Sequence, residues 1–176
     1  IDVADLRRQL VERGPNNTDS PIAAWYPIHD LQQWVDSPEA LAALEADPVG
    51  YFASTRGLVS AGLDGTIYLL LYTDAARSMT HERGTNWALE GTGRTVDEFG
   101  RPAVSFRLDT NGGKLMGRLT QANLQEPMAI VLDGRTYTAP NINGQINTQG
   151  TISGSFTAED LSYLTRPKIL LGGHRQ

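Results

Sequence analysis

The chain contains no cysteine, which excludes disulfide bridges, thiolate catalysis and cysteine-ligated metal sites. It also has no long apolar run: its strongest is Ile67–Tyr72, far short of the roughly 20 residues that a membrane-spanning helix needs. Positive charge is scarce, since 15 Lys and Arg face 20 Asp and Glu, and the cations are scattered along the sequence. Because nucleic acids and anionic membrane surfaces attract clustered cations, both are disfavoured as partners.

The composition that remains is that of a globular protein. Apolar residues make up 40% of the 176 residues and charged residues 20%, which suits one domain of ordinary size or one core with flanking segments. The sequence begins at Ile1 without an initiator methionine and shows no signal sequence. We therefore expect the chain to be part of a longer protein.

Helix signals occur in several segments. Asp2–Glu12 has apolar residues at helical spacing, with its first residue as N-cap. Ser37, followed by proline and glutamate, predicts the start of a second helix that runs to about Ala46. Thr157 and Asp160 form an acidic variant of the capping box, which predicts a third helix ending near residue 165.

Two further segments carry helical patterns next to glycines. Gly112-Gly113 precedes Lys114–Leu124, which has helical spacing. The stretch Thr73–Gly93 is predicted to have a helical middle and to end in a turn at Gly91-Thr92-Gly93.

Strand patterns lie between these helices, in Thr66–Tyr72, Arg101–Leu108, Met128–Leu132, Arg135–Thr138 and Thr151–Phe156. Asp133-Gly134 separates two of them and is a strong hairpin signal. We predict an α+β fold, with an antiparallel or mixed sheet and helices packed mainly on one face. Residues 1–60 are expected to form a mainly helical attachment, residues 61–165 one compact unit, and residues 166–176 a truncated or disordered tail.

Histidine chemistry has little support in the sequence. His29 and His81 each precede an acidic residue, but adjacent side chains diverge in regular structure, and His174 lies in the expected tail. The zinc-protease motif that His81 could open would require a second histidine where Thr85 stands.

Carboxylates and glycine loops give equally weak signals. Four carboxylates could supply an acid–base pair: Asp97, Glu98, Asp109 and Asp133. A hairpin turn explains Asp133, and the end of a strand explains Asp109. Gly91–Arg94 lacks the remaining parts of a phosphate loop, and Gly112–Lys114 offers only what any helix start offers. We therefore predict no enzyme activity and no catalytic, cofactor-binding or metal site.

An ordered set of motifs resembles the head of the first periplasmic region of the SecD proteins. It spans Asp97–Leu164 and consists of Asp97–Phe106, Leu119-Thr120, Ala129–Arg135, Tyr137–Pro140 and Ile152–Thr157. The block from "AIVLDG" to "TAP" is the most diagnostic part. The resemblance assigns residues 61–165 to a SecD-like periplasmic head domain.

The resemblance implies a function in protein export. SecD proteins, with SecF, are inner-membrane components that use the proton gradient to assist export through the SecYEG channel, and their periplasmic region is thought to engage the emerging preprotein. The resemblance also implies an extracytoplasmic location, as part of an integral membrane protein whose membrane-spanning segments lie outside this chain. The proton-coupling residues of the family lie in membrane helices, so none is assigned here. Strand addition at a sheet edge would tolerate varied clients, but the sequence identifies no preprotein-binding residue.

Two other functions remain open at this point. The aromatic group Trp25, Tyr26 and Trp34 could bind a peptide or small ligand in a stand-alone module, although packing explains it more simply. An enzyme site assembled from scattered carboxylates would require them to converge in one cleft.

Overall fold

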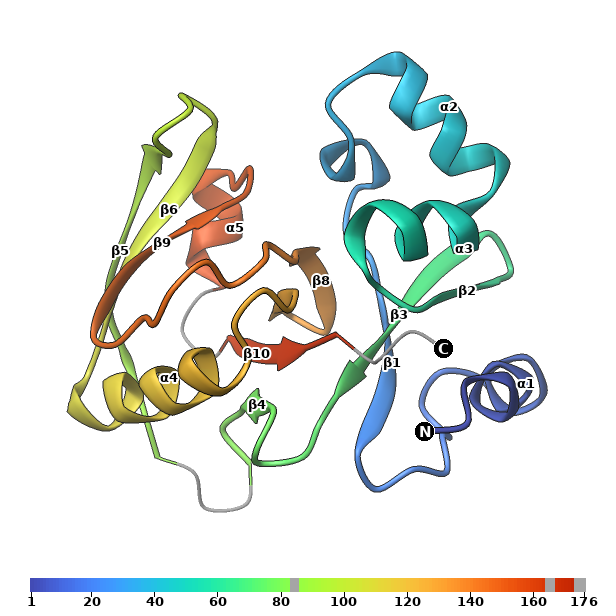
Figure 1. Cartoon of the computed structure of the whole chain (residues 1–176), viewed down its shortest axis with the longest axis horizontal. Coiled ribbons are helices and arrows are strands. Elements are labelled where there is room, and N and C mark those ends of the chain that lie inside the picture. The colour runs from blue at the N-terminus through green and yellow to red at the C-terminus, as the bar shows by residue number, and fades with distance from the viewer. Residues whose placement is uncertain (83–85, 164–166, 173–176) are drawn as a thin grey trace.

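A computed structural model of the chain describes residues 1–82, 86–163 and 167–172 and has the predicted α+β fold (Figure 1). The helical elements are α1 (Val3–Arg13), the 3-10 turn η1 (Leu31–Trp34), α2 (Pro38–Ala46), α3 (Pro48–Tyr51), the π-helical turn η2 (Phe52–Arg56), α4 (Thr110–Ala122) and α5 (Ala158–Ser162). The strands are β1 (Ala23–Pro27), β2 (Ser60–Leu63), β3 (Thr66–Tyr72), β4 (Ser78–Met79), β5 (Leu89–Val96), β6 (Pro102–Leu108), β7 (Met128–Leu132), β8 (Arg135–Thr138), β9 (Gln149–Ser153) and β10 (Lys168–Leu171). None of the described helices combines the length and the apolar character that a membrane span requires.

The strands of the described residues form three antiparallel sheets rather than the single sheet that was predicted. Their orders are β1-β3-β2, β4-β10-β7-β8 and β5-β6-β9. Figure 1 shows the first sheet with α1, α2 and α3 in one half of the molecule, and the other two sheets with α4 and α5 in the other half. Residues 23–27 thus share a sheet with residues 60–72, so the expected division at residue 60 is not the one that the strands follow.

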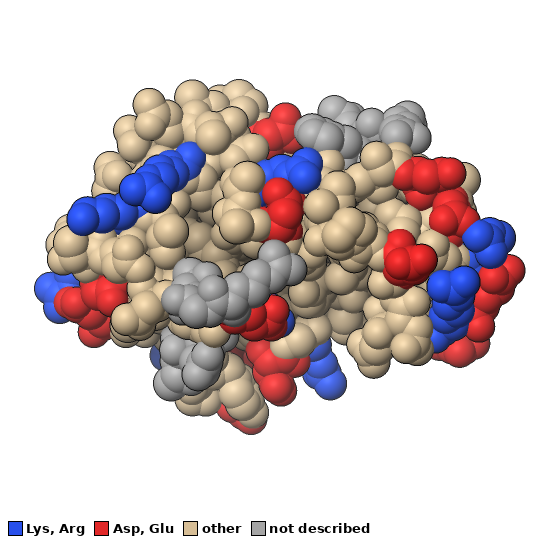
Figure 2. Space-filling view, turned by 90° about the horizontal axis from the view of Figure 1, so that it is seen from below, with Lys and Arg blue, Asp and Glu red and all other residues tan. Residues whose placement is uncertain are grey.

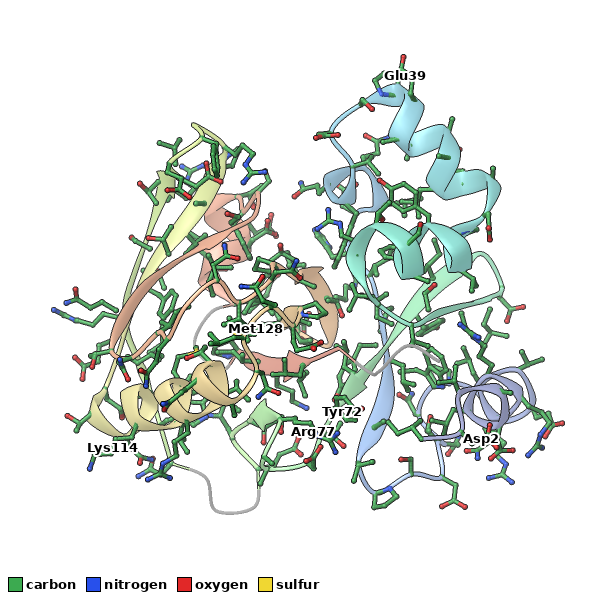
Figure 3. The ribbon with its side chains drawn as sticks, viewed as in Figure 1. Asp2, Glu39, Tyr72, Arg77, Lys114 and Met128 are labelled. Carbon is green, nitrogen blue, oxygen red and sulfur yellow. The ribbon has the colours of Figure 1, made fainter. Side chains whose placement is uncertain are left out.

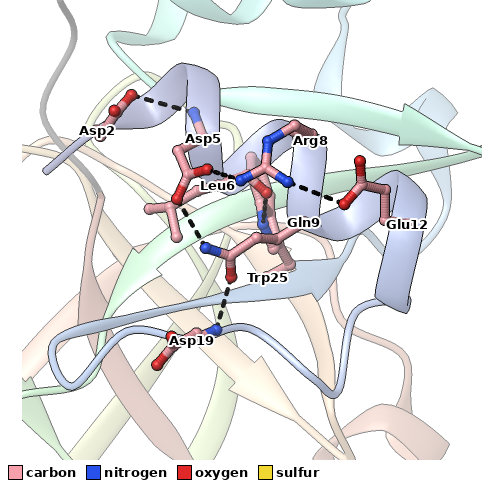
Figure 4. Close-up of polar contacts among 8 residues, drawn as sticks. All are labelled: Asp2, Asp5, Leu6, Arg8, Gln9, Glu12, Asp19 and Trp25. Atoms are coloured by element: carbon pink, nitrogen blue, oxygen red, sulfur yellow. Dashed lines mark hydrogen bonds and ion pairs between the residues drawn. The ribbon is translucent and has the colours of Figure 1, made fainter.

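The first helix and its cap match the prediction. Asp2 caps α1 by accepting a hydrogen bond from the backbone N–H of Asp5. The indole Nε1–H of Trp25 donates to the carbonyl of Leu6 at 3.1 Å, and the buried Gln9 accepts from a backbone N–H of the loop after the helix (Figure 4). These bonds fix α1 against β1 of the first sheet.

The tail prediction is wrong for residues 168–172. Lys168–Leu171 form β10, which lies between β4 and β7 in the four-stranded sheet, and Leu170 is completely buried. The short apolar run before Gly172 gave no signal in the sequence because its burial depends on distant segments: β4, β7 and the first half of the molecule. Residues 173–176 and the predicted helix end near residue 165 lie outside the described residues.

The region before β6 also differs from expectation. The described part of Thr73–Gly93 contains β4 and the start of β5, and no helix. Gly91-Thr92-Gly93 is the middle of β5, paired with β6, and not a turn. Glycine is depleted in strands, so the pattern indicated a turn, whereas pairing with the apolar β6 overrides that local preference.

Helix α4 begins earlier than predicted. Asp109 is its N-cap and accepts from the N–H of Gly112 at 2.7 Å, so both glycines lie inside the helix rather than before it. A Cβ at Gly113 would lie 2.8 Å from the Thr148 hydroxyl oxygen and 3.3 Å from that residue's backbone. These glycines therefore allow the loop before β9 to pack closely on the helix.

The predicted hairpin is confirmed. Asp133 and Gly134 connect β7 to β8 and both have positive φ, 50° and 73°. Positive φ at both central residues is what a two-residue hairpin turn needs if its twist is to match that of the strands. All five residues of β7 are buried. This explains why β7 reads as a continuous apolar run rather than an alternating one.

The two halves share one hydrophobic cluster and several main-chain contacts. Leu58, Leu69 and Phe52 of the first half pack in the same buried cluster as Val131 and Leu170 of the second. Backbone bridges join residue 28 to 136 and residue 71 to 172. The halves are therefore packed together as parts of one folded unit.

A cation–π contact lies at the same junction. The guanidinium of Arg77 stacks 3.6 Å from the ring centroid of Tyr72 and pairs with Asp74, and the two labelled side chains adjoin in Figure 3. The Arg77 carbonyl also accepts from the N–H of Leu171 in β10. This contact ties the end of β3 to the second half.

Candidate functional site

The outer edge of β5 is the longest open strand edge in the described part of the chain. β5 has eight residues and pairs only with β6, and no described strand pairs with its other side. The N–H of Asp97 bonds to the carbonyl of Arg101, and antiparallel hydrogen-bonding alternates from that pair along the strand. The N–H and C=O groups of Thr92, Arg94 and Val96 therefore point outward, available to an added strand.

The hairpin loop at the end of β5 is held by one carboxylate. Asp97 accepts hydrogen bonds from the backbone N–H groups of Phe99 and Arg101, from the Arg101 guanidinium at 3.0 Å and from the Ser153 hydroxyl. These bonds, the backbone N–H of Arg101 foremost, lower the pKa of Asp97. Gly100 supplies the positive φ, 78°, that the turn needs. The "DEFGR" motif thus builds a hairpin end that is cross-linked by hydrogen bonds.

Two large apolar side chains are exposed at this hairpin end. Val96 is 61% exposed and Phe99 is 72% exposed. Phe99 has the largest exposed fraction of any large hydrophobic residue in the described part of the chain. Figure 1 shows the β5–β6 hairpin projecting beyond the body of the molecule. The loop therefore presents an aromatic ring to solvent next to an open strand edge.

A shallow hollow of about 550 Å³ lies on the sheet beside that edge. It is lined by residues from all three strands, including Gly91, Ser105 and Gly150. Gly150 is required for close packing, because a Cβ there would lie 2.8 Å from the ring of Phe106. The missing side chain of Gly91 and the small side chain of Ser105 leave the hollow open, whereas Gly150 makes room for the core side chain of Phe106.

The aromatic group does not form one site. Trp25 and Trp34 are almost fully buried, in two different hydrophobic clusters, and Tyr26 is half-buried beside the second. Trp34 donates its Nε1–H to the His29 carbonyl and packs edge-on against Phe52. The packing interpretation of these residues is confirmed.

The apolar cavity of the second half is small. It lies under the β5-β6-β9 sheet, has a volume of about 40 Å³ and is lined by apolar side chains such as Trp87, Phe106 and Ile130. Drug-sized ligands occupy pockets of about 300–1,000 Å³. The cavity is a packing defect of the core rather than a ligand pocket of that size.

The two described histidines lie in separate aromatic stacks. His29 stacks on Tyr137 with ring centroids 4.0 Å apart, and His81 stacks on Trp87 at 4.3 Å. Burial is the main cause that raises the pKa of Tyr137. His174 lies outside the described residues.

The four candidate carboxylates do not converge in one cleft. Asp97 and Glu98 belong to the β5–β6 loop, Asp109 caps α4 and Asp133 forms the β7–β8 turn. Among the described residues, no group of three or more His, Cys, Asp or Glu side chains is arranged to hold a metal ion. Gly91–Arg94 lies in β5 and Gly112–Lys114 within α4, so neither forms a loop around an anion.

Charges of both signs are interspersed on the face seen in Figure 2. Several cations are paired with nearby carboxylates, as Lys168 with Glu82 and Arg107 with Glu90. The described residues of this face form no continuous basic patch of the kind that binds nucleic acid.

Sequence reasoning missed the β5 edge. The signal was present, because Leu89, Thr92, Thr95 and Val96 suit a strand, but Gly91 and Gly93 interrupted it. The sequence of a single strand does not show whether that strand lies at the edge of its sheet, since this depends on how all the strands of the sheet are ordered.

Comparison with known protein families finds a match in the second half of the chain. The family model "SecDF, P1 head subdomain" matches residues 79–167. The SecD translocase subunit of Rhodobacter capsulatus is 42% identical over 83 residues, which are 45% of this chain and 15% of that protein. That of Leptotrichia buccalis is 37% identical over 78 residues, 44% of this chain and 19% of that protein. The matched segment is thus under a fifth of either relative.

Solved structures of SecDF align over more of the chain but less closely. One, described as a membrane component that enhances protein export, covers 88% of this chain and 68% of its own, with 22% identity and a TM-score of 0.38. The family model spans just over half of the chain, and its match includes β5, β6, the hairpin turn and β9. The resemblance seen in the sequence is therefore confirmed, and the chain belongs to the SecDF P1 head subdomain family.

Proposed function

We propose that this chain is the extracytoplasmic part of a SecD-like subunit and assists protein export by engaging the emerging preprotein. The open outer edge of β5 is the observation that carries the proposal. Every unfolded polypeptide has backbone N–H and C=O groups, whatever its sequence. An open strand edge can form hydrogen bonds with those groups and so can bind clients with different side chains. The exposed Val96 and Phe99 add apolar contact at the end of the same edge.

The partners follow from the same proposal. SecD relatives are translocase subunits, so SecF and the SecYEG channel are the proposed partners of the full-length protein, and the periplasmic side of the inner membrane is the proposed location. The chain itself is proposed to be non-enzymatic and to work without a cofactor. The first half of the molecule, which holds the β1-β3-β2 sheet with α1, α2 and α3, is proposed to act as an attachment to the head.

A stand-alone ligand-binding module has less support. Its aromatic group is divided between two cores, and the apolar cavity is about 40 Å³.

Site-specific photo-crosslinking in the full-length protein tests the proposal. A photoreactive residue at Thr95, exposed on β5, should crosslink to an exported chain arrested in transit. The same residue at Glu39, exposed on α2 in the other half (Figure 3), is the matched control. Equal labelling from both positions, or none from Thr95, would contradict engagement at the edge.

A proline substitution tests the strand-addition mechanism. Arg94→Pro removes an outward-pointing N–H while leaving the inward bonds of β5 to β6 in place. We expect it to weaken client binding by about fivefold, the equivalent of one main-chain hydrogen bond of about 1 kcal/mol. Arg94→Gln removes the same charge but keeps the N–H and should bind as the native chain does. Equal loss in both variants would indicate a charge effect and refute strand addition.

A further inference from the structure

A groove of about 440 Å³, lined by both polar and apolar residues, lies between the two halves. One wall comes from the first half and includes Trp34, Asp36 and Arg56; the other comes from the ends of β8 and β9 and includes Thr138 and Ser153. Its volume lies within the range of about 300–1,000 Å³ found for ligand-binding clefts. Its lining also includes Arg101 and Pro102 at the β5–β6 hairpin end, but no residue of β5.

Arg56 is a half-buried cation in this groove with unused hydrogen-bonding capacity. Its Nη2 donates to the Trp34 carbonyl at 2.7 Å, and its guanidinium lies 5.5 Å from the Trp34 ring centroid. No carboxylate oxygen among the described residues lies within 4.0 Å of it, whereas Arg101, the other arginine of the groove, pairs with Asp97 at 3.0 Å. A guanidinium has five N–H donors, so Arg56 can still bind a carboxylate through two of them.

Burial of this charge costs free energy, and desolvation accordingly lowers the pKa of Arg56. An incoming carboxylate would offset that cost, because a charge-assisted pair is stronger where water is partly excluded. Asp36, exposed in the same groove, attracts the Arg56 charge and so opposes the effect of desolvation, but more weakly than desolvation acts. It does not form an ion pair with Arg56.

The backbone that positions Arg56 is irregular. Phe52–Arg56 form a π-helical turn in which the N–H of Gly57 bonds to the Phe52 carbonyl, and Gly57 adopts a left-handed φ of 66°. Phe52 is fully buried and holds the start of the turn in place. A π-helical turn contains one residue more than an α-helical turn, and this additional residue changes the direction of Arg56 at the end of the turn. π-helical turns are rare and are found frequently at functional sites.

We propose that the groove binds an acidic side chain of an extended polypeptide, with Arg56 as the ligand of its carboxylate. The accessible apolar groups of the walls, such as Tyr51 and Pro102, would contact the rest of the peptide. This inference rests on the proposed engagement of preprotein and adds a preference to it: a segment with Asp or Glu binds in the groove, while neutral segments bind at the β5 edge alone.

The test compares two short labelled peptides of the same sequence, one with a central glutamate and one with glutamine, by fluorescence anisotropy with the whole chain. We expect the glutamate peptide to bind about tenfold more tightly, with a preference that decreases as salt is raised. Arg56→Gln should abolish the preference and leave binding of the glutamine peptide unchanged. Arg118→Gln, at an exposed position on α4, is the matched control and should retain the preference.

Asp36→Asn provides a second variant that does not remove the guanidinium. It deletes the groove's own negative charge and should tighten binding of the glutamate peptide by about twofold to threefold without affecting the glutamine peptide. Equal binding of the two peptides to the native chain would overturn the groove inference and leave client engagement standing. Absence of binding by either peptide would overturn both.

Discussion

Truncation of Leu170 in β10 should strongly destabilise the whole protein. Leu170 is completely buried, pairs in register with Ala129 of β7 and packs in the cluster that joins the two halves. Leu170→Ala removes three carbon atoms, which corresponds to about 2.4 kcal/mol of lost burial at about 0.8 kcal/mol per methylene. The cavity left behind brings the expected loss to about 3–4 kcal/mol.

Thermal unfolding followed by circular dichroism measures this effect. For a chain of this size, each kcal/mol lowers Tm by about 2–4 °C, so a decrease of about 6–16 °C is expected. Lys168→Ala, two residues earlier on the same strand, removes only a surface ion pair to Glu82 and should cost below about 1 kcal/mol. If both variants unfolded within about 1 °C of the native chain, β10 would not be an integral strand and the reasoning would be refuted.

Two more predictions concern the candidate site. Because hydrogen bonds to the Arg101 N–H and other donors lower the pKa of Asp97, its contribution to stability is present above the unfolded pKa of about 3.9 and is lost as pH falls through the lower folded value. Tm should therefore fall more steeply below about pH 4 for the native chain than for Asp97→Asn; parallel curves would contradict this. Gly150→Ala should cost about 1–3 kcal/mol in urea unfolding because its Cβ would lie 2.8 Å from an aromatic carbon, whereas Gly144→Ala, with open space around it, should change stability by less than about 0.5 kcal/mol. Equal midpoints for the two variants would show that the sheet accommodates the methyl group.

Local signals predicted the elements whose structure depends on neighbours in the sequence. The cap at Asp2, the cap at Ser37 and the turn at Asp133-Gly134 each use a side chain or a positive φ within a few residues, and the structure has all three. The strand bounds of β3 and β7 were predicted correctly because their residues are strongly apolar. β5 was missed, since its glycines obscure a strand that forms only by pairing with β6.

The candidate site was less predictable than the fold. Strand addition could be expected from the sequence, but no contact residue could be named, because an open edge depends on the order of strands in the sheet. The Arg56 groove was equally invisible, since its walls come from segments that are separated by about a hundred positions.

The sequence alone determined the family of this protein, its α+β class, its main caps and its central hairpin, all of which rest on motifs and local backbone chemistry. Tertiary structure decided what remains: the division into three sheets, the burial of β10, the open edge of β5 and the half-buried charge of Arg56. Each of these depends on which distant segments pack together and exclude water. That information is distributed over the whole chain and is absent from any single window of it.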